Sequence, residues 1–386
     1  MLLLSYNLKS LLIRWKSAVL AIFGVGLVVA VFVGLLAMAS GFQMALSETG
    51  SSQNAIVLQQ GAQSELSSSF PKEAGDRVTD DPRIAHGADG QPLVSSELVT
   101  IVALPRRSDN ELSNITVRGV TPAAFNVRPD IRIVTGRNLK PGLFEIVVGK
   151  SVRDRIRGLD VGRQVRLMKN GFEVVGVMDT DGSAFDSEIW GDFDAMASAF
   201  NRAGSENSLT VRLADPNVVA AFDRDLGADP QFHLELKPER QYYEDQAGPL
   251  SKFLRGLASF VSVVMGVGAV FGAMNTMNAV VAARSREIGT LRVLGFSRVM
   301  ILVGFVFEGV MLALAGGAIG CLLSLLINGL QATTTANRGE IAFAFHVTAM
   351  DLSYGLLFAV IMGIVGSLLP AFRAARMPIV ASLREA

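Results

Sequence analysis

The sequence predicts a membrane α-helical fold with four transmembrane helices and a mixed α/β extracytoplasmic domain inserted between the first and second helices. Half of the residues are hydrophobic and the mean hydropathy is +0.40, yet the chain carries 35 acidic and 35 basic residues. Charged and apolar residues must therefore be segregated along the chain. The runs that contain no Asp, Glu, Lys or Arg are residues 17–47, 256–283, 299–307, 309–337 and 352–372.

These runs are long enough to cross a bilayer, which takes roughly 20 apolar residues in a helix, once the third run is joined across Glu308. They are continuous rather than alternating, which favours helices over the strands of a barrel. The first run also has features of a cleaved signal peptide, because Arg14 and Lys16 precede it and small residues occur at Ala37 and Ala39. Its apolar core, 18–39, exceeds the roughly 7 to 15 residues of a signal core, so we favour an uncleaved anchor.

Positive charges near the ends of the spans predict the orientation. They are Lys9, Arg14 and Lys16 before the first span, Arg284, Arg286, Arg292 and Arg298 between the second and third, and Arg373, Arg376 and Arg384 after the fourth. The only short segment on the other side, 331–350, contains just Arg338. The positive-inside rule therefore places both termini and the 284–298 loop in the cytoplasm, and the large polar region outside.

The expected organisation follows from these spans. The segments are a cytoplasmic N-terminal segment (1–16), transmembrane helix 1 (17–41), an outer α/β domain (42–250), transmembrane helix 2 with a stalk (251–283), a cytoplasmic helical loop (284–298), transmembrane helix 3 (299–328), a short outer loop (329–350), transmembrane helix 4 (351–370) and a cytoplasmic tail (371–386). After Gly248-Pro249, residues 250–283 can run as one helix of about 50 Å, longer than the hydrocarbon layer. Such a helix would join the outer domain stiffly.

Within the outer domain, β-branched residues between Gly, Pro and Asp predict short strands at 54–58, 98–104, 115–120, 145–148, 165–168, 172–177 and 209–213. Helical pieces are expected at 150–157, 193–202 and 217–226, and residues 64–69 read as a mobile loop.

Composition and motifs exclude several classes of function. The net charge of zero gives no indication of a nucleic-acid partner. Gly149-Lys150-Ser151 is not a phosphate-binding loop, because Phe144 stands where the motif requires glycine. The one cysteine, Cys321, excludes an intrachain disulfide, and the three histidines are far apart, so a metal site is not expected. No nucleophile motif occurs, so no catalytic site is expected other than a Ser/His/Asp group made only by folding.

Two predicted cytoplasmic segments are the most specific part of the sequence: NTMNAVVAARSREIGTLRVLGFSR at 275–298 and PAFRAARMPIVASLR at 370–384. Together with one span, a large outer domain and three closing spans, they resemble the MacB/FtsX-type permease family of ABC transporters. Gly136-Arg137, 145–149, Gly162 and 172–177 also resemble the periplasmic core domain of that family.

The first segment is expected to contain a short amphipathic helix. Ile288, Leu291, Val293 and Leu294 would form its apolar flank, Arg284, Arg286 and Arg292 would point to water or lipid headgroups, and Gly295 would end it. The resemblance implies a coupling helix that inserts into an ATPase subunit; the alternative is an interfacial helix that only anchors the loop. The coupling residues implied are Arg284, Arg286, Glu287, Ile288, Gly289, Leu291, Arg292 and Gly295.

In the second segment, Pro370 would end or kink the fourth span, and Arg373 and Arg376 would share one helical face beside anionic lipid or an acidic partner. The resemblance implies that Pro370, Arg373, Arg376 and Pro378 contact the cytoplasmic partner. The same arginines would also serve as simple membrane anchors.

Intramembrane polar and small residues form a further set. Glu308 lies about ten residues inside the third span, where a carboxylate costs on the order of 3 kcal/mol, so it should face protein, pair with a cation or be protonated. Its role is either structural pairing or gating. Gly268 and Gly272 form a GxxxG step in the second span, and Gly316 and Gly320 form another in the third, which suits close helix packing or a dimer interface.

The resemblance implies a non-enzymatic permease subunit in the bacterial inner membrane, paired with a second copy or a sister permease over a cytoplasmic ABC ATPase. ATP and Mg would be used by that ATPase, and this chain would bind no cofactor. Movements driven by ATP would pass to the periplasm by mechanotransmission and export or extract a lipid, lipoprotein, peptide or drug-like cargo, with room for a periplasmic adaptor or membrane-fusion protein. The alternative is an FtsX-like subunit that regulates a cell-wall hydrolase without transport.

Overall fold

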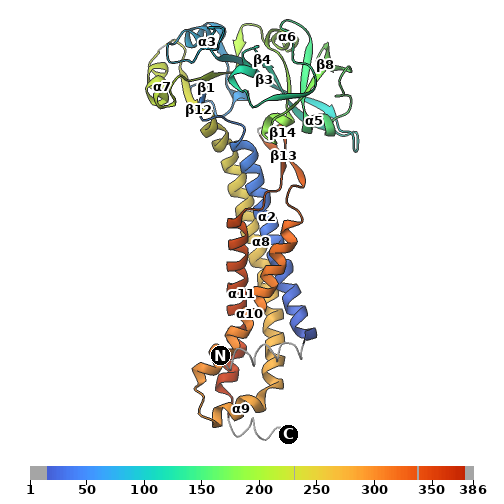
Figure 1. The fold of residues 1–386 in the computed structure, drawn as a ribbon, viewed down its shortest axis with the longest axis vertical. Helices are drawn as coiled ribbons and strands as arrows, with labels where there is room; N and C mark the ends of the chain where they lie inside the picture. Colours follow the sequence, from blue (N-terminus) through green and yellow to red (C-terminus); the bar gives the residue numbers. More distant parts are fainter. Residues whose placement is uncertain (1–14, 230, 337–338, 379–386) are drawn as a thin grey trace. The chain divides into compact units, whose positions relative to one another are not determined.

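The computed structural model describes residues 15–229, 231–336 and 339–378. The chain divides into two compact units (Figure 1). The helical unit comprises residues 1–41, 250–330 and 345–386, and the α/β unit comprises residues 42–249 and 331–344. Lys9, Arg14, Arg338 and Arg384, which contributed to the predicted orientation, lie outside the described residues.

The long helices are α2 (Trp15–Ser47), α8 (Glu239–Ala283), α10 (Arg298–Leu325) and α11 (Ala349–Arg376), and each contains a stretch apolar enough to span a membrane. The short helix α9 (Ser285–Val293) lies between α8 and α10. The predicted break at Gly248-Pro249 is wrong, since α8 begins at Glu239 and contains Pro249. Burial of Tyr242 and Tyr243 holds the first turns of α8 despite the hydrogen bond that proline removes.

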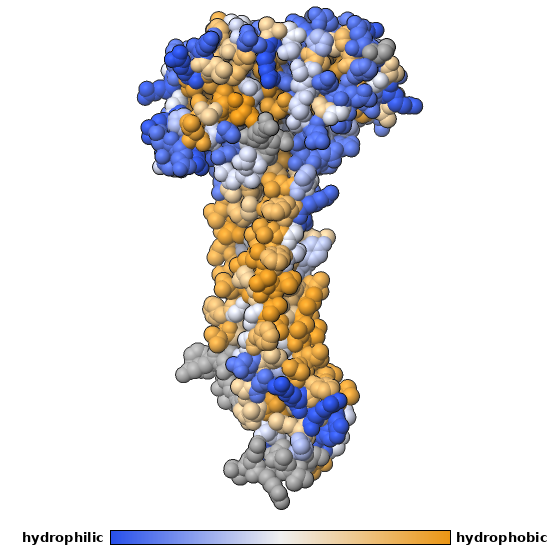
Figure 2. Space-filling view, turned by 180° about the vertical axis from the view of Figure 1, so that it is seen from behind, coloured by the Kyte–Doolittle hydropathy of each residue, from blue (hydrophilic) through white to orange (hydrophobic). Residues whose placement is uncertain are grey.

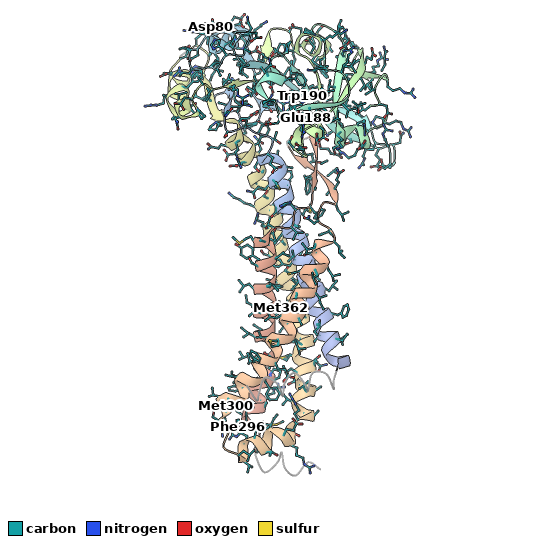
Figure 3. All side chains as sticks on the ribbon, viewed as in Figure 1. Asp80, Glu188, Trp190, Phe296, Met300 and Met362 are labelled. Carbon is teal, nitrogen blue, oxygen red and sulfur yellow. The ribbon has the colours of Figure 1, made fainter. Side chains whose placement is uncertain are left out.

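Close contacts between helices organise the helical unit. Val29, Ala313, Ala359 and Met362 belong to a buried cluster shared by α2, α10 and α11, and Figure 3 labels Met362 among these helices. Hydrophobic residues dominate the outward surface of this unit (Figure 2), as expected for contact with lipid.

The α/β unit is built on a sheet with the strand order β12-β1-β11-β3-β4-β9-β6-β8-β5, and β7 pairs with β8. The pairs β4–β9 and β6–β8 are parallel, whereas the other pairs of this sheet are antiparallel. Its strands are β1 (Asn54–Gln59), β3 (Val94–Pro105), β4 (Leu112–Val120), β5 (Arg132–Gly136), β6 (Glu145–Gly149), β7 (Gln164–Leu167), β8 (Asn170–Asp179), β9 (Ile189–Asp192), β11 (Ser208–Arg212) and β12 (Leu234–Pro238).

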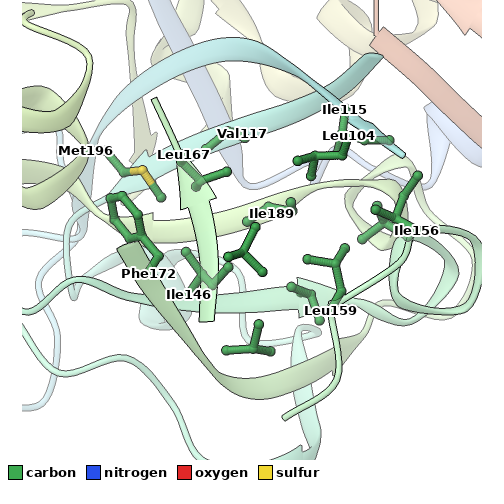
Figure 4. Packing of buried hydrophobic residues seen from close by; sticks show 14 of the residues in the cluster. Leu104, Ile115, Val117, Ile146, Ile156, Leu159, Leu167, Phe172, Ile189 and Met196 are labelled. Atoms are coloured by element: carbon green, nitrogen blue, oxygen red, sulfur yellow. The ribbon is translucent and has the colours of Figure 1, made fainter. Parts of the chain in front are cut away.

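Helices and smaller strands complete this unit. The helices are α3 (Lys72–Thr79), α4 (Ala124–Val127), α5 (Lys150–Arg155), α6 (Phe193–Ala199) and α7 (Val219–Gly227), with 3₁₀ turns η1 (Glu65–Ser67), η2 (Ala184–Ser187) and η3 (Pro216–Val218). Strands β2 (Phe70–Pro71) and β10 (Ser205–Glu206) pair with each other. One buried cluster includes Ile115, Ile146, Phe172, Ile189 and Met196, which come together from β4, β6, β8, β9 and α6 (Figure 4).

The seven predicted strands and three predicted helical pieces are confirmed within a few residues at their ends. The expectation of a mobile loop at 64–69 is wrong, because η1 lies there and Glu65 and Ser68 are buried. The segment expected as a short loop, 329–350, contains the hairpin β13 (Gln331–Ala336) and β14 (Gly339–Ala344). Phe343 of this hairpin is buried against Phe42.

Candidate functional site

Helix α9 and the ends of its neighbours form the candidate site in the helical unit. Only Arg284 separates α8 from α9. Glu287 lies in the first turn of α9 and Arg292 in the last, where their charges complement the helix dipole. A short, well-ended helix therefore follows α8 without a flexible linker.

Gly295 ends α9, as the sequence predicts. Its φ is 92°, a left-handed conformation that favours glycine. Its backbone N–H donates to the carbonyl of Arg292 at 3.2 Å, and the N–H of Phe296 donates to the carbonyl of Leu291 at 3.1 Å. This pair of bonds is the Schellman arrangement, which satisfies the last carbonyls of a helix.

Ile288 anchors α9 to the long helices. It is buried in a cluster with Met277 of α8, Ile301 and Phe305 of α10, and Ala371 of α11. The predicted apolar flank divides here, because Leu291 is half-buried, whereas Val293 and Leu294 are 62% and 70% exposed. Ile288 therefore holds α9 against the long helices. At the other end of the flank, Val293 and Leu294 form an apolar tip that is exposed within the described chain.

Arg284 has a different environment from the one predicted. It is buried rather than turned to water or headgroups, and its Nη1 lies 3.0 Å from Glu308 Oε2 on α10. Its Nε also lies 3.3 Å from Glu287 Oε2. The prediction of exposure is wrong because the carboxylate of Glu308, also buried, needs a cation in an apolar surrounding.

The other arginine of the predicted flank, Arg292, joins α9 to the second motif. It is half-buried, and its Nη1 donates to the carbonyl of Ala375 on α11 at 3.3 Å. Arg286, by contrast, is exposed, as expected. The two segments that carry the family resemblance are thus adjacent in space.

Helix α11 does not end at Pro370, and this part of the prediction is wrong. The helix continues to Arg376, and Pro370 is buried inside it. Arg373 and Arg376 are both exposed; Nη1 of Arg373 lies 3.5 Å from Asn278 Oδ1, and the guanidinium of Arg376 lies 4.0 Å from the ring centre of Phe372. Pro378 follows the helix and is exposed.

A partly open cavity lies between α9 and the start of α10. Phe296 and Met300, which lie close together in Figure 3, line it together with Leu291, Arg284 and Glu308. Ser297 caps α10 by accepting a hydrogen bond from the N–H of Met300. Leu291 is the residue of the predicted apolar flank that lines this cavity together with Ile288, whereas Val293 and Leu294 do not line it.

The two glycine steps differ. An added Cβ at Gly320 would lie 2.4 Å from the carbonyl oxygen of Gly26, and one at Gly316 would lie 2.7 Å from that of Ile22, so this step packs α10 against α2. At Gly268 and Gly272 an added Cβ would meet none of the described atoms within 4 Å. The step at Gly316 and Gly320 therefore has a packing role within the chain. The step at Gly268 and Gly272 faces outward from the chain.

The α/β unit contains a buried ionic network that the sequence did not predict. Arg118 lies within hydrogen-bond distance of Glu65, Glu97 and Glu188, and Arg128 pairs with Glu97 and Glu239. Burial alone would raise the pKa of Glu97, but the two guanidinium groups lower it below its ordinary value. Figure 3 labels Glu188 beside Trp190, whose Nε1 donates to it at 2.8 Å.

The remaining residues that the sequence analysis considered for phosphate or metal binding have roles in the structure of the protein. Lys150 pairs with Asp179 at 2.9 Å, and an added Cβ at Gly149 would collide with the backbone of Asp186. Over the described ranges, no group of three or more His, Cys, Asp or Glu side chains could hold a metal ion. Cys321 is buried as a free thiol.

The fold is that of a multi-pass membrane protein with an inserted α/β domain. Residues 18–228 match the MacB-like periplasmic core domain, and residues 259–379 match the FtsX-like permease C-terminal domain. The chain therefore belongs to the MacB/FtsX-type ABC transporter permease family, and the resemblance drawn from the two motifs is confirmed.

Several relatives are similar over most of the chain. The "Uncharacterized ABC transporter permease YknZ" of Bacillus subtilis is 25% identical over 98% of this chain and 97% of its own length. The "Macrolide export ATP-binding/permease protein MacB" of Neisseria gonorrhoeae is 24% identical over 96% of this chain and 59% of its own length, and that of Neisseria meningitidis serogroup A is 25% identical over 67% and 42%. The chain thus spans about half the length of these MacB relatives.

Among solved structures, the extracellular domain of the noncanonic ABC-type transporter YknZ from Gram-positive bacteria has a TM-score of 0.36 and 14% identity, covering 48% of this chain and 99% of that domain.

Proposed function

We propose that this chain is the transmembrane subunit of an ABC transporter, and that a separate cytoplasmic ATPase acts on it through α9. The observation that carries the proposal is the anchoring of α9: Ile288 lies in a cluster with three long helices, and Arg284 pairs with Glu308. An element fixed in this way and exposing apolar residues at its other end is suited to receive a force from a partner.

The partner would cover Val293 and Leu294. Burial of one leucine side chain contributes roughly 1.5–3 kcal/mol, or about ten- to a hundredfold in affinity. ATP and Mg would be bound by the ATPase and not by this chain. The orientation drawn from positive charges would place α9 and both termini in the cytoplasm of a bacterial cell and the α/β unit outside the inner membrane.

Motion would pass outward by mechanotransmission. Helices α2 and α8 each run without interruption from the helical unit into residues of the α/β unit, which supports such a relay. The outward-facing Gly268 and Gly272 are suited to contact with a second permease copy or a sister permease. The cargo would be a lipid, lipoprotein, peptide or drug-like molecule, received in the periplasm by an adaptor where one is present.

The relatives reported above are named as transporter permeases or exporters, which favours transport over control of a cell-wall hydrolase. No observation on the described residues favours that regulatory alternative.

The test is Leu294→Glu in the full chain reconstituted with its ATPase. We expect at least a tenfold loss of ATPase binding, because a charge replaces an apolar contact, and a matching loss of ATPase stimulation. Leu143→Glu, at an exposed leucine of the α/β unit, is the matched control and should leave both unchanged. Equal binding by the two variants would refute the assignment of α9.

A further inference from the structure

A cavity that is partly open to solvent lies within the α/β unit. We call it the acidic cavity; its lining includes Glu65, Arg118, Glu188, Tyr242, Tyr243 and Glu340. The residues come from η1, β4, α8, β14 and the segment after η2, which are distant in the sequence. A cavity bounded by so many elements is held in place by the fold.

The charges around the acidic cavity do not balance. Glu340 is paired with Arg155 at 2.8 Å. The remaining network contains four carboxylates, of Glu65, Glu97, Glu188 and Glu239, and two guanidinium groups, of Arg118 and Arg128. The described network therefore has two more carboxyl groups than guanidinium groups, in a place where unbalanced charge is costly. A positive group supplied by a ligand would reduce that excess.

Two carboxylate oxygens can accept a further hydrogen bond. Glu65 Oε2 and Glu188 Oε1 each accept one from Arg118 Nη2, at 3.1 and 2.9 Å, which leaves an acceptor position on each oxygen. Both residues line the cavity, so these positions lie next to space that a ligand can occupy.

Tyr243 gives an independent indication of a ligand. Its side chain lines the cavity and is only 6% exposed, and its hydroxyl has no hydrogen-bond partner among the described residues. Buried hydroxyls are almost always paired, because leaving one unpaired costs free energy. A bound group that donates to this oxygen would give the hydroxyl a hydrogen-bond partner.

The surroundings favour an organic cation over a metal ion. Tyr242 and Tyr243 both line the cavity, and their ring centres lie 5.1 Å apart. Aromatic faces attract ammonium groups, and Leu46 and Ile341 add an apolar wall. For a metal ion, by contrast, the described residues offer no group of three or more His, Cys, Asp or Glu side chains.

We propose that the acidic cavity binds a protonated amine carried on a small apolar body. The ammonium group donates to Glu65, Glu188 and Tyr243, and the body lies against the aromatic and apolar side of the cavity. Binding itself does not depend on transport, but the role of the site in selecting or sensing a cargo rests on the proposed function.

The test uses the full chain in lipid nanodiscs with Trp15→Phe, so that Trp190 is the only tryptophan. Since Trp190 donates to Glu188, a ligand at this carboxylate changes its emission. Phenethylammonium chloride is titrated at pH 7 against 2-phenylethanol, a neutral molecule of nearly the same shape. We expect a saturable response to the amine with at least tenfold higher affinity than for the alcohol.

Tyr243→Phe keeps the ring and removes only the unpaired hydroxyl, so it should fold and bind the amine about fivefold more weakly. The wild-type comparison of amine with alcohol needs no variant and remains decisive if Tyr243→Phe does not fold. Absence of a saturable response, equal affinity for the two probes, or full affinity in a folded Tyr243→Phe variant would overturn the proposal. No ATPase is present in this experiment, so its failure is distinct from a failure of the transport assignment.

Discussion

Glu206 should make the stability of the α/β unit depend on pH near neutrality. It is 1% exposed, and burial affects its pKa more strongly than the Ser96 side chain, which lowers it. Burial raises the pKa of Glu206 to about 7, and the nearby carboxylates of Asp76 and Glu73 add to this effect. The folded protein therefore holds a proton on this side chain at pH values where the unfolded chain has released it.

The change in the pKa of Glu206 on folding determines how much the free energy of unfolding depends on pH. A rise in this pKa from 4.5 to about 7 corresponds to about 3 kcal/mol in the free energy of unfolding. Between these values the folded state binds more protons than the unfolded state, so the free energy of unfolding falls as the pH rises, and the loss is complete above about pH 7. Glu206→Gln removes this titration. The variant should be about 2–3 kcal/mol more stable than the wild type at pH 8 and nearly equal to it at pH 4.

The assay is urea unfolding of the full chain in mild detergent with Trp15→Phe, followed by the emission of Trp190, which is fully buried in the α/β unit. Glu173→Gln, at an exposed position on β8, is the matched control and should show little change at either pH. If Glu206→Gln changes the free energy of unfolding by the same amount at pH 4 and pH 8, then Glu206 does not titrate in this range and the reasoning is refuted.

Three further changes test the helical unit. Glu308→Gln leaves the buried Arg284 without its partner on α10 and should cost about 2–4 kcal/mol, seen as a lower midpoint of thermal unfolding in detergent; an unchanged midpoint would contradict a role for the pair. Gly320→Ala, which forces a Cβ against the backbone of α2, should cost about 1–3 kcal/mol in the same assay, whereas Gly268→Ala should be neutral; equal effects would contradict the packing. Gly295→Val strains the end of α9 at a φ of 92° and should reduce stimulation of the ATPase severalfold while membrane insertion is retained; normal stimulation would show that the shape of this turn is unimportant.

Much of the architecture could be predicted because bilayer spans are encoded locally. A run without charges specifies a spanning helix by itself, and Gly295 specifies the end of α9 by its freedom at positive φ. The environment of Arg284 could not be predicted in the same way. An arginine at the end of a span normally points to water, and only the return of α10 brings Glu308 within 3.0 Å of it.

The buried network of the α/β unit illustrates the same limit. Glu65 lies in a serine-rich stretch that has every local sign of a loop, and it is ordered by Arg118, which lies 53 residues away in the sequence. Glu206 likewise lies between small polar residues, and its burial comes from the pairing of β10 with β2. Local sequence identifies elements, whereas unusual charge environments arise from contacts that form only after these elements pack.

The join between α8 and α9 determines how a force on α9 would spread. A flexible loop would absorb such a force, but here a single residue, Arg284, separates the two helices and is held by Glu308 on α10. Ile288 adds contacts to α10 and α11, and Arg292 adds a hydrogen bond to α11. Displacing α9 alone would expose Ile288 and separate a buried ion pair, each at a cost of about 2 kcal/mol or more. Moving α8, α10 and α11 together with α9 preserves both contacts. The low-energy response to a push on this short helix is therefore a concerted shift of the bundle.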